Sequence, residues 1–210
     1  MLAALHHFFA FVGWTDCRVR YLRVQRKLFC EPRRELTRTD YTKLFAAAKK
    51  RGQTRLALLI ETLGAVGIRV SETQYITVQA AEAGRADIRL KGKIRTILLP
   101  KKLCRKLLKY ARKQKIASGK IFLTKSGKGL SRGQIWAELK RLSVYAGVEA
   151  EKVFPHNLRH LFAVSFYRVC RDIAKLADVL GHSSIETTRI YLLTSGNEHL
   201  RLLDKVQLVL

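Results

Sequence analysis

The sequence predicts a mainly α-helical domain with one small antiparallel β-sheet, an α+β fold. Over most of the chain, apolar residues recur every three or four positions, which is the period of an amphipathic helix. From Ala86 the period changes to two, on either side of a tight Lys-Gly-Lys turn, and this pattern is typical of a β-hairpin. The chain has 210 residues, 48% of them hydrophobic, which is enough for one good core.

The first helix is expected over residues 2–12, because its apolar residues share one helical face, and Gly13 ends it. The basic run "RVRYLRVQRKLFCEPRR" that follows predicts a linker, since Pro32 breaks a helix. A run of like charges is usually solvated, although this one could equally lie on a phosphate backbone.

Two helices are expected next. Thr37 is placed to cap the first, with Asp40 in its opening turn and an apolar stripe that includes Leu44 and Ala48. The second carries an apolar stripe at 56, 59, 60 and 63 and stops near Gly64 and Gly67. Ser71 is predicted to cap a further short helix.

The hairpin is expected from residues 86–90 and 94–100, joined by the turn Lys91 to Lys93. A helix follows around residues 103–110, and "KIFLT", residues 120–124, is predicted as a third short strand. The segment between Ser131 and Gly147 predicts another helix with a cap at each end.

The remainder is predicted to be helical, with breaks after Pro155, at 171–172 and at Gly181. Ser183 and Glu186 predict a capping box for the last helix of this region, which places Tyr191 about two turns into it and close to the His182 turn. Residues 197–210 have an apolar stripe and could form one more helix.

The charge points to a polyanionic partner. Lys and Arg number 41 against 16 Asp and Glu, so 41 minus 16 gives a net charge of +25. Such an excess repels itself in a compact fold, which favours nucleic acid as the partner. A merely solubilising surface is the alternative, but that normally mixes both signs.

The cysteines and the N-terminus exclude other classes of protein. The four cysteines lie far apart without metal-ligand spacing, so we interpret them as reduced, intracellular thiols with no structural zinc. The apolar opening has no basic segment or cleavage site, and His6 and His7 interrupt it. It is therefore interpreted as neither a signal peptide nor a membrane span.

Several cationic and titratable residues stand close together near the C-terminus. His156 and Arg159 are three apart on a helix, so both project from one face and can reach a single anion. Taken singly, an arginine is more often a surface or ion-pair residue, a histidine a helix cap, and a tyrosine a half-buried core residue. The functional interpretation depends on the whole set and its spacing.

That set resembles the tyrosine recombinase, or phage integrase, superfamily, which includes Xer-type recombinases and integrases of mobile elements. The resembling motifs are "GIRVSE", "LKGKIR", "HNLRH" and "LGHSS", with a tyrosine nine residues after the last histidine. The positions that match the family's catalytic residues are Arg69, Lys91, His156, Arg159, His182 and Tyr191. The resemblance runs from about Glu35 to near the C-terminus and implies this family's catalytic-domain fold.

The resemblance implies a mechanism. Tyr191 would be the nucleophile that forms a 3′-phosphotyrosyl bond to DNA, with no metal or nucleotide cofactor. Two guanidinium groups suit the phosphate oxygens, because each offers paired donors and stays charged. The histidines would add donors, and His156 could take the proton of the tyrosine.

Other residues take supporting roles by the same resemblance. Lys91 would be the general acid, with Lys93 as the alternative because the turn is about one residue shorter than usual. Glu72 would orient Arg69. His160 is interpreted as mainly structural, although the family often has histidine there.

The sequence departs from the family at its front. Residues 1–34 resemble only the last helix and linker of a core-binding domain, so half of the DNA clamp is expected to be missing. Residues 35–196 would form the catalytic domain. Residues 197–210 would form a helix that either folds back on its own core or is exchanged between protomers. The expected partner is double-stranded DNA, with a homo-tetramer on two DNA sites and a monomer in solution. The expected location is the cytoplasm, with no membrane association.

The leading hypothesis is a site-specific recombinase or integrase. Two alternatives stay open: a DNA-binding regulator that keeps the fold without productive recombination, and a type IB topoisomerase-like activity on single sites. The intact residue set favours catalysis, and the missing half of the clamp favours single-site action.

Overall fold

The computed structural model describes residues 2–14, 35–90, 93–182 and 184–192, which belong to two units. The first unit contributes α1 (Leu2–Phe11), close to the predicted range. In it the ring of Phe9 stacks on that of Trp14, with centroids 6.1 Å apart. The predicted linker, the turn residues Lys91 and Gly92, and the predicted tail helix lie outside the described residues.

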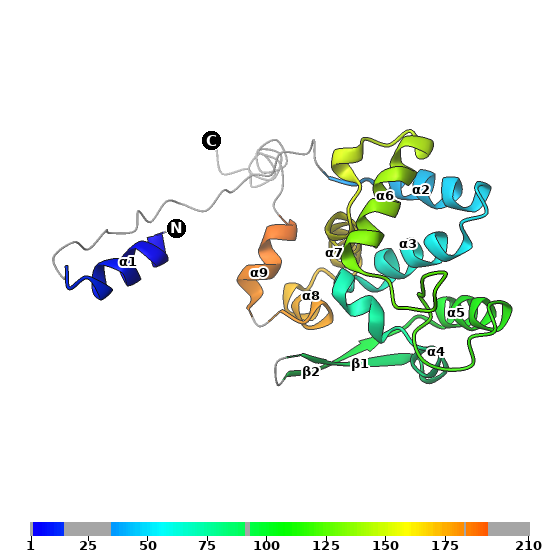
Figure 1. Cartoon of the computed structure of the whole chain (residues 1–210), viewed down its shortest axis with the longest axis horizontal. Helices are drawn as coiled ribbons and strands as arrows, with labels where there is room; N and C mark the ends of the chain where they lie inside the picture. The colour runs from blue at the N-terminus through cyan, green and yellow to red at the C-terminus, as the bar shows by residue number, and fades with distance from the viewer. Residues whose placement is uncertain (1, 15–34, 91–92, 183, 193–210) are drawn as a thin grey trace, which may run out of the picture. The chain divides into compact units, whose positions relative to one another are not determined.

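The second unit, residues 35–192, begins with α2 (Arg38–Lys50) and α3 (Thr54–Val66) (Figure 1). The predicted cap of α2 is confirmed: the Thr37 hydroxyl accepts from the Asp40 backbone N–H at 3.1 Å, and the Asp40 carboxylate accepts from the Thr37 backbone N–H, also at 3.1 Å. Gly67 ends α3 in the left-handed region, with a φ of 65°.

A 3₁₀ helix, η2 (Val70–Tyr75), and α4 (Val78–Ala83) lead into the sheet. The prediction that Ser71 caps the short helix here is wrong. Arg69 is the N-cap residue, and its backbone N–H donates to the Glu72 carboxylate at 2.7 Å. The carboxylate of Glu72 is charged, so it accepts a hydrogen bond more strongly than a neutral hydroxyl accepts one. Its bond to Arg69 therefore sets the start of η2 before Ser71.

The hairpin consists of β1 (Arg85–Leu90) and β2 (Lys93–Leu98), antiparallel as predicted, with Arg85 opposite Leu98 and Leu90 opposite Lys93. The third strand predicted at 120–124 is wrong: within the described residues this segment makes only isolated bridges, Thr77 to Lys120 and Leu123 to Gly129. Its adjacent residues Ile121 and Phe122 are both buried, so the segment lacks the alternation of a strand with one exposed face.

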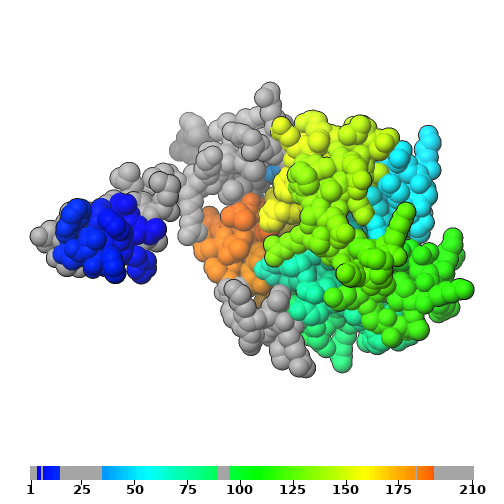
Figure 2. Space-filling model, viewed as in Figure 1, coloured from blue at the N-terminus to red at the C-terminus, as the bar shows by residue number. Residues whose placement is uncertain are grey.

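The hairpin is followed by α5 (Lys101–Lys113), α6 (Arg132–Ala146) and the 3₁₀ turn η3 (Ala150–Lys152). The predicted caps of α6 are confirmed, because Ser131 accepts from Gln134 and Gly147 adopts a left-handed φ of 61°. In the space-filling view, α6 crosses the near face between α8–α9 and α2 (Figure 2).

The last helices are α7 (Pro155–Cys170), α8 (Ile173–Leu180), α9 (Ile185–Arg189) and the 3₁₀ turn η4 (Ile190–Leu192). The predicted breaks are confirmed at Pro155, Arg171 and Gly181. The predicted capping box of α9 is not: the cap is Ser184, whose hydroxyl accepts from the Glu186 backbone N–H. Tyr191 therefore lies in η4, directly after a five-residue helix.

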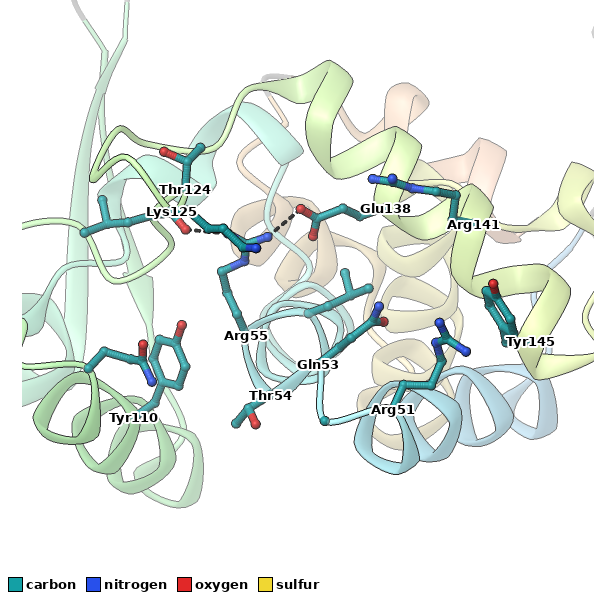
Figure 3. Close-up of a pocket in the computed structure, with 14 residues that line it drawn as sticks. Arg51, Gln53, Thr54, Arg55, Tyr110, Thr124, Lys125, Glu138, Arg141 and Tyr145 are labelled. Carbon is teal, nitrogen blue, oxygen red and sulfur yellow. Dashed lines mark hydrogen bonds and ion pairs between the residues drawn. The ribbon is translucent and has the colours of Figure 1, made fainter.

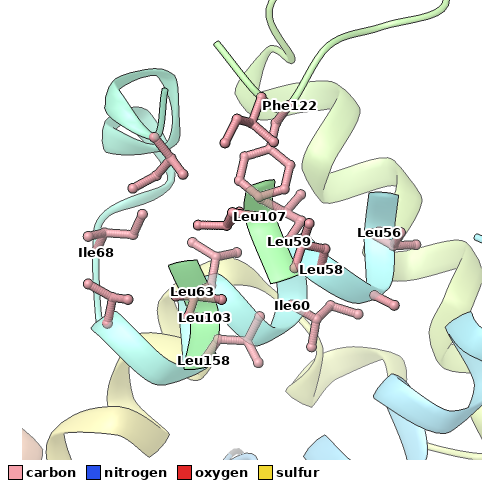
Figure 4. Close-up of a cluster of buried hydrophobic side chains, with 14 of the residues drawn as sticks. Leu56, Leu58, Leu59, Ile60, Leu63, Ile68, Leu103, Leu107, Phe122 and Leu158 are labelled. Atoms are coloured by element: carbon pink, nitrogen blue, oxygen red, sulfur yellow. The ribbon is translucent and has the colours of Figure 1, made fainter. Parts of the chain in front are cut away.

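The core is built around α3, which packs against α2, α5 and α7. Figure 4 shows the leucines of α3 meeting Leu103 and Leu107 of α5 and Leu158 of α7. A smaller buried cluster joins Ala163, Leu176 and Leu180 to Tyr191, so the tyrosine is held by the packing of α7 and α8. No helix among the described residues is long and apolar enough to cross a membrane.

Candidate active site

Five of the predicted catalytic residues, Arg69, His156, Arg159, His182 and Tyr191, line one cavity of about 420 Å³. Its walls come from the turn after α3, the starts of α6 and α7, the turn after α8, and α9 with η4. The polar side chains that line it are Arg69, Ser71, Arg132, His156, Arg159, His182, Thr187 and Tyr191.

Arg159 is the most buried of these cations, with 3% of its surface exposed. Its Nη1 donates to the carbonyl of Gly67 at 2.6 Å, and its Nη2 to that of Leu180 at 2.8 Å. Burial lowers the pKa of Arg159, and a hydrogen bond to the Tyr191 side chain opposes that shift. Since the two carbonyls lie at the ends of α3 and α8, their exposed dipoles favour a cation here. Arg159 thus joins two helix ends beside the tyrosine.

Glu72 organises the second cation. Only 1% of its side chain is exposed, and it accepts from Arg69 Nη1 at 2.9 Å while 44% of the Arg69 side chain stays exposed. The Arg69 backbone N–H binds the other carboxylate oxygen. Held in this way, Arg69 keeps guanidinium N–H groups free to face an anion in the cavity.

Sequence reasoning missed Arg95, the last residue of the "LKGKIR" motif. Its Nη1 donates to Glu72 at 3.2 Å, and its Nη2 to the carbonyl of Val179 at 2.6 Å. Burial lowers the pKa of Arg95 to about 10, although Glu72 opposes the shift. The strand period was a usable signal, because Arg95 lies two residues from the buried Ile97 and so on the same face.

Tyr191 is surrounded by histidine rings. The ring centroids of His156, His160 and His182 lie 5.6, 5.4 and 5.8 Å from that of Tyr191. Tyr191 is only 4% exposed, and the His182 ring stacks on it at an angle of 12°. His160, predicted as mainly structural, also faces Glu35, with 3.9 Å between Nε2 and Oε1.

His182 links the cations to α9. Its Nε2 lies 2.9 Å from Arg159 Nη2, and its Nδ1 lies 2.9 Å from the hydroxyl of Thr188. Burial, then the positive charges of Arg159, Arg69 and Arg95, lower the pKa of His182 to about 4. The ring is therefore neutral at pH 7. Sequence reasoning also missed Thr188, whose position six residues after His182 was the only signal.

His156 stands at the first turn of α7, and its side chain is exposed toward the cavity. Burial of its ring, then the charges of Arg159 and His160, lower the pKa of His156. A neutral imidazole next to a phenol can accept a proton, whereas an imidazolium cannot.

The structure does not place the predicted general acid. Lys91 lies outside the described residues, and Lys93 is described only as the first residue of β2, where its backbone pairs with Leu90. β1 contacts η2, so the hairpin approaches the segment that follows Arg69.

A larger cavity, of about 740 Å³, lies at the other end of α3 (Figure 3). Two of its arginines are engaged within the protein: Arg55 donates to the carbonyl of Leu123 and pairs with Glu138, and Arg51 lies 3.5 Å above the Tyr145 ring. None of the predicted catalytic residues that the structure describes lines this cavity.

The fold and the site together define the class. A mainly helical domain with a β-hairpin, which gathers arginines and histidines around one buried tyrosine, is a tyrosine recombinase catalytic domain. Residues 34–197 match the Phage integrase family, and the chain belongs to that family. The resemblance seen in the sequence and the predicted fold class are thereby confirmed.

Similar proteins support the assignment. The tyrosine recombinase XerD of Xanthomonas axonopodis pv. citri (strain 306) is 32% identical over 158 residues, which cover 68% of this chain and 52% of that protein. XerA of Pyrococcus furiosus (strain ATCC 43587 / DSM 3638 / JCM 8422 / Vc1) is 30% identical over 200 residues, which cover 91% of this chain and 67% of that protein. The chain spans about half the length of the first of these relatives.

The fold is also similar to a crystal structure of the XerH site-specific recombinase bound to difH substrate, a pre-cleavage complex. The TM-score is 0.71 and the sequence identity 22%, with 98% of this chain and 63% of that chain covered. At this identity the likeness establishes the fold alone.

Proposed function

We propose that this chain cleaves and rejoins double-stranded DNA through a covalent 3′-phosphotyrosyl intermediate on Tyr191, as a site-specific recombinase or integrase. The observation that carries the proposal is the convergence of Tyr191 with two histidines, His156 and His182, and two arginines, Arg69 and Arg159, on one cavity. Because a phosphodiester is an anion, a nucleophile approaches it only where its charge is neutralised.

In the proposed reaction the Tyr191 oxygen attacks the phosphorus, and the bond from phosphorus to the 5′-oxygen breaks. Charge on the non-bridging oxygens is stabilised by Arg69 and by the Arg159 donors that the backbone carbonyls do not use. Tyr191 becomes the 3′-phosphotyrosyl ester, so the energy of the broken bond is kept for rejoining.

Two proton transfers complete the step. His156 takes the phenolic proton, which its lowered pKa allows because the ring is neutral at pH 7. Lys91, or Lys93, donates a proton to the departing 5′-oxygen, which leaves as a hydroxyl. The free 5′-hydroxyl is the nucleophile of the reverse step, which rejoins the strand.

Strand exchange requires two DNA sites. We propose a homo-tetramer that holds both, in which residues 197–210 dock on a neighbouring protomer. Deleting these residues is then expected to reduce assembly on DNA, measured by light scattering, more than it reduces cleavage at a single site.

Covalent trapping tests the proposed function without knowledge of the target. The protein is incubated with nicked duplexes of randomised sequence, from which a short 5′-hydroxyl strand diffuses away after cleavage, and protein–DNA adducts are isolated under denaturing conditions and sequenced. Wild type should form a protease-sensitive adduct. Tyr191→Phe removes only the nucleophilic oxygen, so it should bind DNA normally and form none.

Three outcomes separate the hypotheses. An adduct with Tyr191→Phe would mean that another nucleophile acts. DNA binding without any wild-type adduct would identify a DNA-binding regulator. An adduct that relaxes supercoiled DNA but never exchanges strands between two selected sites would identify the topoisomerase-like activity.

A further inference from the structure

The hydrogen bonds of His182 fix where its ring proton lies. Arg159 has donors only, so at 2.9 Å from Arg159 Nη2 the His182 Nε2 is an acceptor and carries no proton. The ring is neutral, so its one proton is on Nδ1, which then donates to the Thr188 hydroxyl oxygen at 2.9 Å.

This tautomer is the wrong one for binding a phosphate. Of the two ring nitrogens, Nδ1 is bonded to Thr188, which is fully buried at 0% exposure, so Nε2 is the nitrogen on the side of Arg159 and the cavity. An Nε2 that carries a lone pair repels a phosphate oxygen. Only the Nε2-protonated ring can donate to it.

We propose that Thr188 is a positioning residue whose hydroxyl reverses its hydrogen bond with His182 when a phosphodiester enters the site. In the arrangement described above, Thr188 accepts from Nδ1. With phosphate bound, the Arg159 N–H that met Nε2 donates to the phosphate instead. The Thr188 hydroxyl donates to Nδ1, and His182 holds its proton on Nε2 and donates it to a non-bridging oxygen. The inference depends on the proposed function, because it assumes that a phosphate occupies the cavity.

The chemistry of threonine allows this reversal. A hydroxyl has one donor and two acceptor lone pairs and rotates about its C–O bond, whereas an amide or a carboxylate cannot change roles in this way. The proton count is unchanged: the ring loses the proton on Nδ1 to solvent and gains one on Nε2, so the neutral form persists. Ser184, which caps α9, and burial of the Thr188 side chain keep the hydroxyl beside the ring.

Nitrogen NMR tests the inference directly. In ¹⁵N-labelled protein at pH 7, the His182 ring, assigned by comparison with His182→Gln, should show a protonated Nδ1 and a bare Nε2. Saturating inorganic phosphate should exchange the two. A protonated Nε2 in the free protein, an unchanged ring with phosphate, or a doubly protonated ring would each overturn the inference.

Cleavage kinetics test the role of the hydroxyl on a duplex selected by the trapping experiment. Thr188→Val has the same shape but no hydroxyl and should slow single-turnover adduct formation about tenfold, the effect of one net hydrogen bond. Thr188→Ser keeps the hydroxyl and should restore the rate. In a His182→Ala background, Thr188→Val should cost nothing further, since its effect passes through the ring.

An equal loss in both backgrounds, or no rescue by serine, would make Thr188 a packing residue and overturn the inference. The ring-nitrogen shifts of the DNA-free protein do not depend on cleavage. A chain that forms no adduct at all would therefore contradict the proposed function and leave the predicted tautomer in the free protein to be decided by NMR.

Discussion

Glu72 shows how one residue can organise an active site that it does not line. It is almost fully buried and accepts from the side chains of both Arg69 and Arg95. A buried charge without a partner is strongly destabilising, so the carboxylate and the guanidinium groups require each other. Arg69 is thereby fixed at the cavity, and Arg95 ties the strand β2 to the end of α8.

The histidine at the same site predicts a dependence of stability on pH. An unfolded histidine takes up a proton near pH 6.5, whereas His182 in the folded protein does so only at about 4, because of burial and then the neighbouring arginines. Between these values the unfolded state binds more protons. Stability is therefore full above about pH 6.5 and falls as the pH drops toward 4.

Urea unfolding at pH 7, 6 and 5 measures this effect. The urea midpoint of the wild type should decrease as the pH is lowered, and the midpoint of His182→Gln should decrease less. His7→Gln, in α1, is the matched control and should keep the wild-type pH dependence. Identical pH dependence in wild type and His182→Gln would refute the prediction.

The sequence predicted the members of the site better than their partners. Arg69, His156, Arg159, His182 and Tyr191 were found through short motifs, and the structure brings all five to one cavity. Glu72 was named as the partner of Arg69 from the same motif, three residues away. The distant partners were not found, because the contacts of Arg95 with Val179 and of Arg159 with Gly67 join residues 84 and 92 positions apart. Local spacing carries no information about such pairs.

At the scale of elements, helix ends were predictable where a glycine or a capping side chain was in the sequence. Two cap predictions failed because a neighbouring residue took the role. Glu72 placed the start of η2 before Ser71, and Ser184, not Ser183, capped α9. The segment 120–124 failed for a different reason. Its residue types are typical of a strand, but here adjacent side chains are buried together. Composition alone cannot distinguish such a buried segment from a strand.

The end of α3 gives a prediction about packing. Gly67 has a φ of 65°, and a Cβ there would lie 2.1 Å from Cδ1 of Phe162. Gly67→Ala combines left-handed strain with an overpacked core and should cost about 3 kcal/mol of unfolding free energy. Gly84 has a similar φ of 69° with nothing within 4 Å, so Gly84→Ala should cost only about 1 kcal/mol.

Chemical denaturation of both variants makes this comparison. Because the Gly67 carbonyl accepts from Arg159, Gly67→Ala should also weaken adduct formation, whereas Gly84→Ala should not. Equal losses of stability in the two variants would show that backbone strain alone decides the cost and that Phe162 yields freely.

The hairpin gives a second prediction at this scale. An alkoxide is a poor leaving group, so removing its proton donor should slow cleavage by about 10²- to 10⁴-fold. A substrate with sulfur at the bridging 5′ position needs little protonation, because a thiolate leaves readily. Lys91→Ala should therefore be slow on the oxygen substrate and largely rescued on the sulfur substrate.

Two variants control this experiment. Arg159→Ala should not be rescued by sulfur, since it acts on the non-bridging oxygens, and Lys93→Ala should stay near wild type on both substrates. Rescue that follows Lys93 instead would place the acid two residues later, at the start of β2. Rescue of neither lysine variant would leave the hairpin as a DNA-backbone contact.

At the scale of the whole molecule, part of the excess positive charge lies on one helix, α5. The helix α5 spans 13 residues and has no acidic residue. Six of its cations are exposed: Lys101, Lys102, Arg105, Lys109, Arg112 and Lys113. Like charges four residues apart destabilise a helix by a few tenths of a kcal/mol per pair, so this pattern weakens the isolated domain.

A surface that opposes folding is consistent with neutralisation by a polyanion. We expect α5 to contact DNA phosphates, and the test is the variant with glutamine at 101, 105, 109 and 112. The variant should be more stable than wild type by about 1 kcal/mol at low salt, because repulsion is relieved. Its affinity for random-sequence duplex should be lower, and the log–log slope of affinity against salt should flatten by up to about 3.6, since each phosphate contact contributes about 0.9.

Gains in stability with an unchanged salt slope would mean that α5 is solvated and that the DNA lies on other cations. An affinity for duplex that does not vary with salt in wild type would contradict nucleic acid as the partner that the charge predicts.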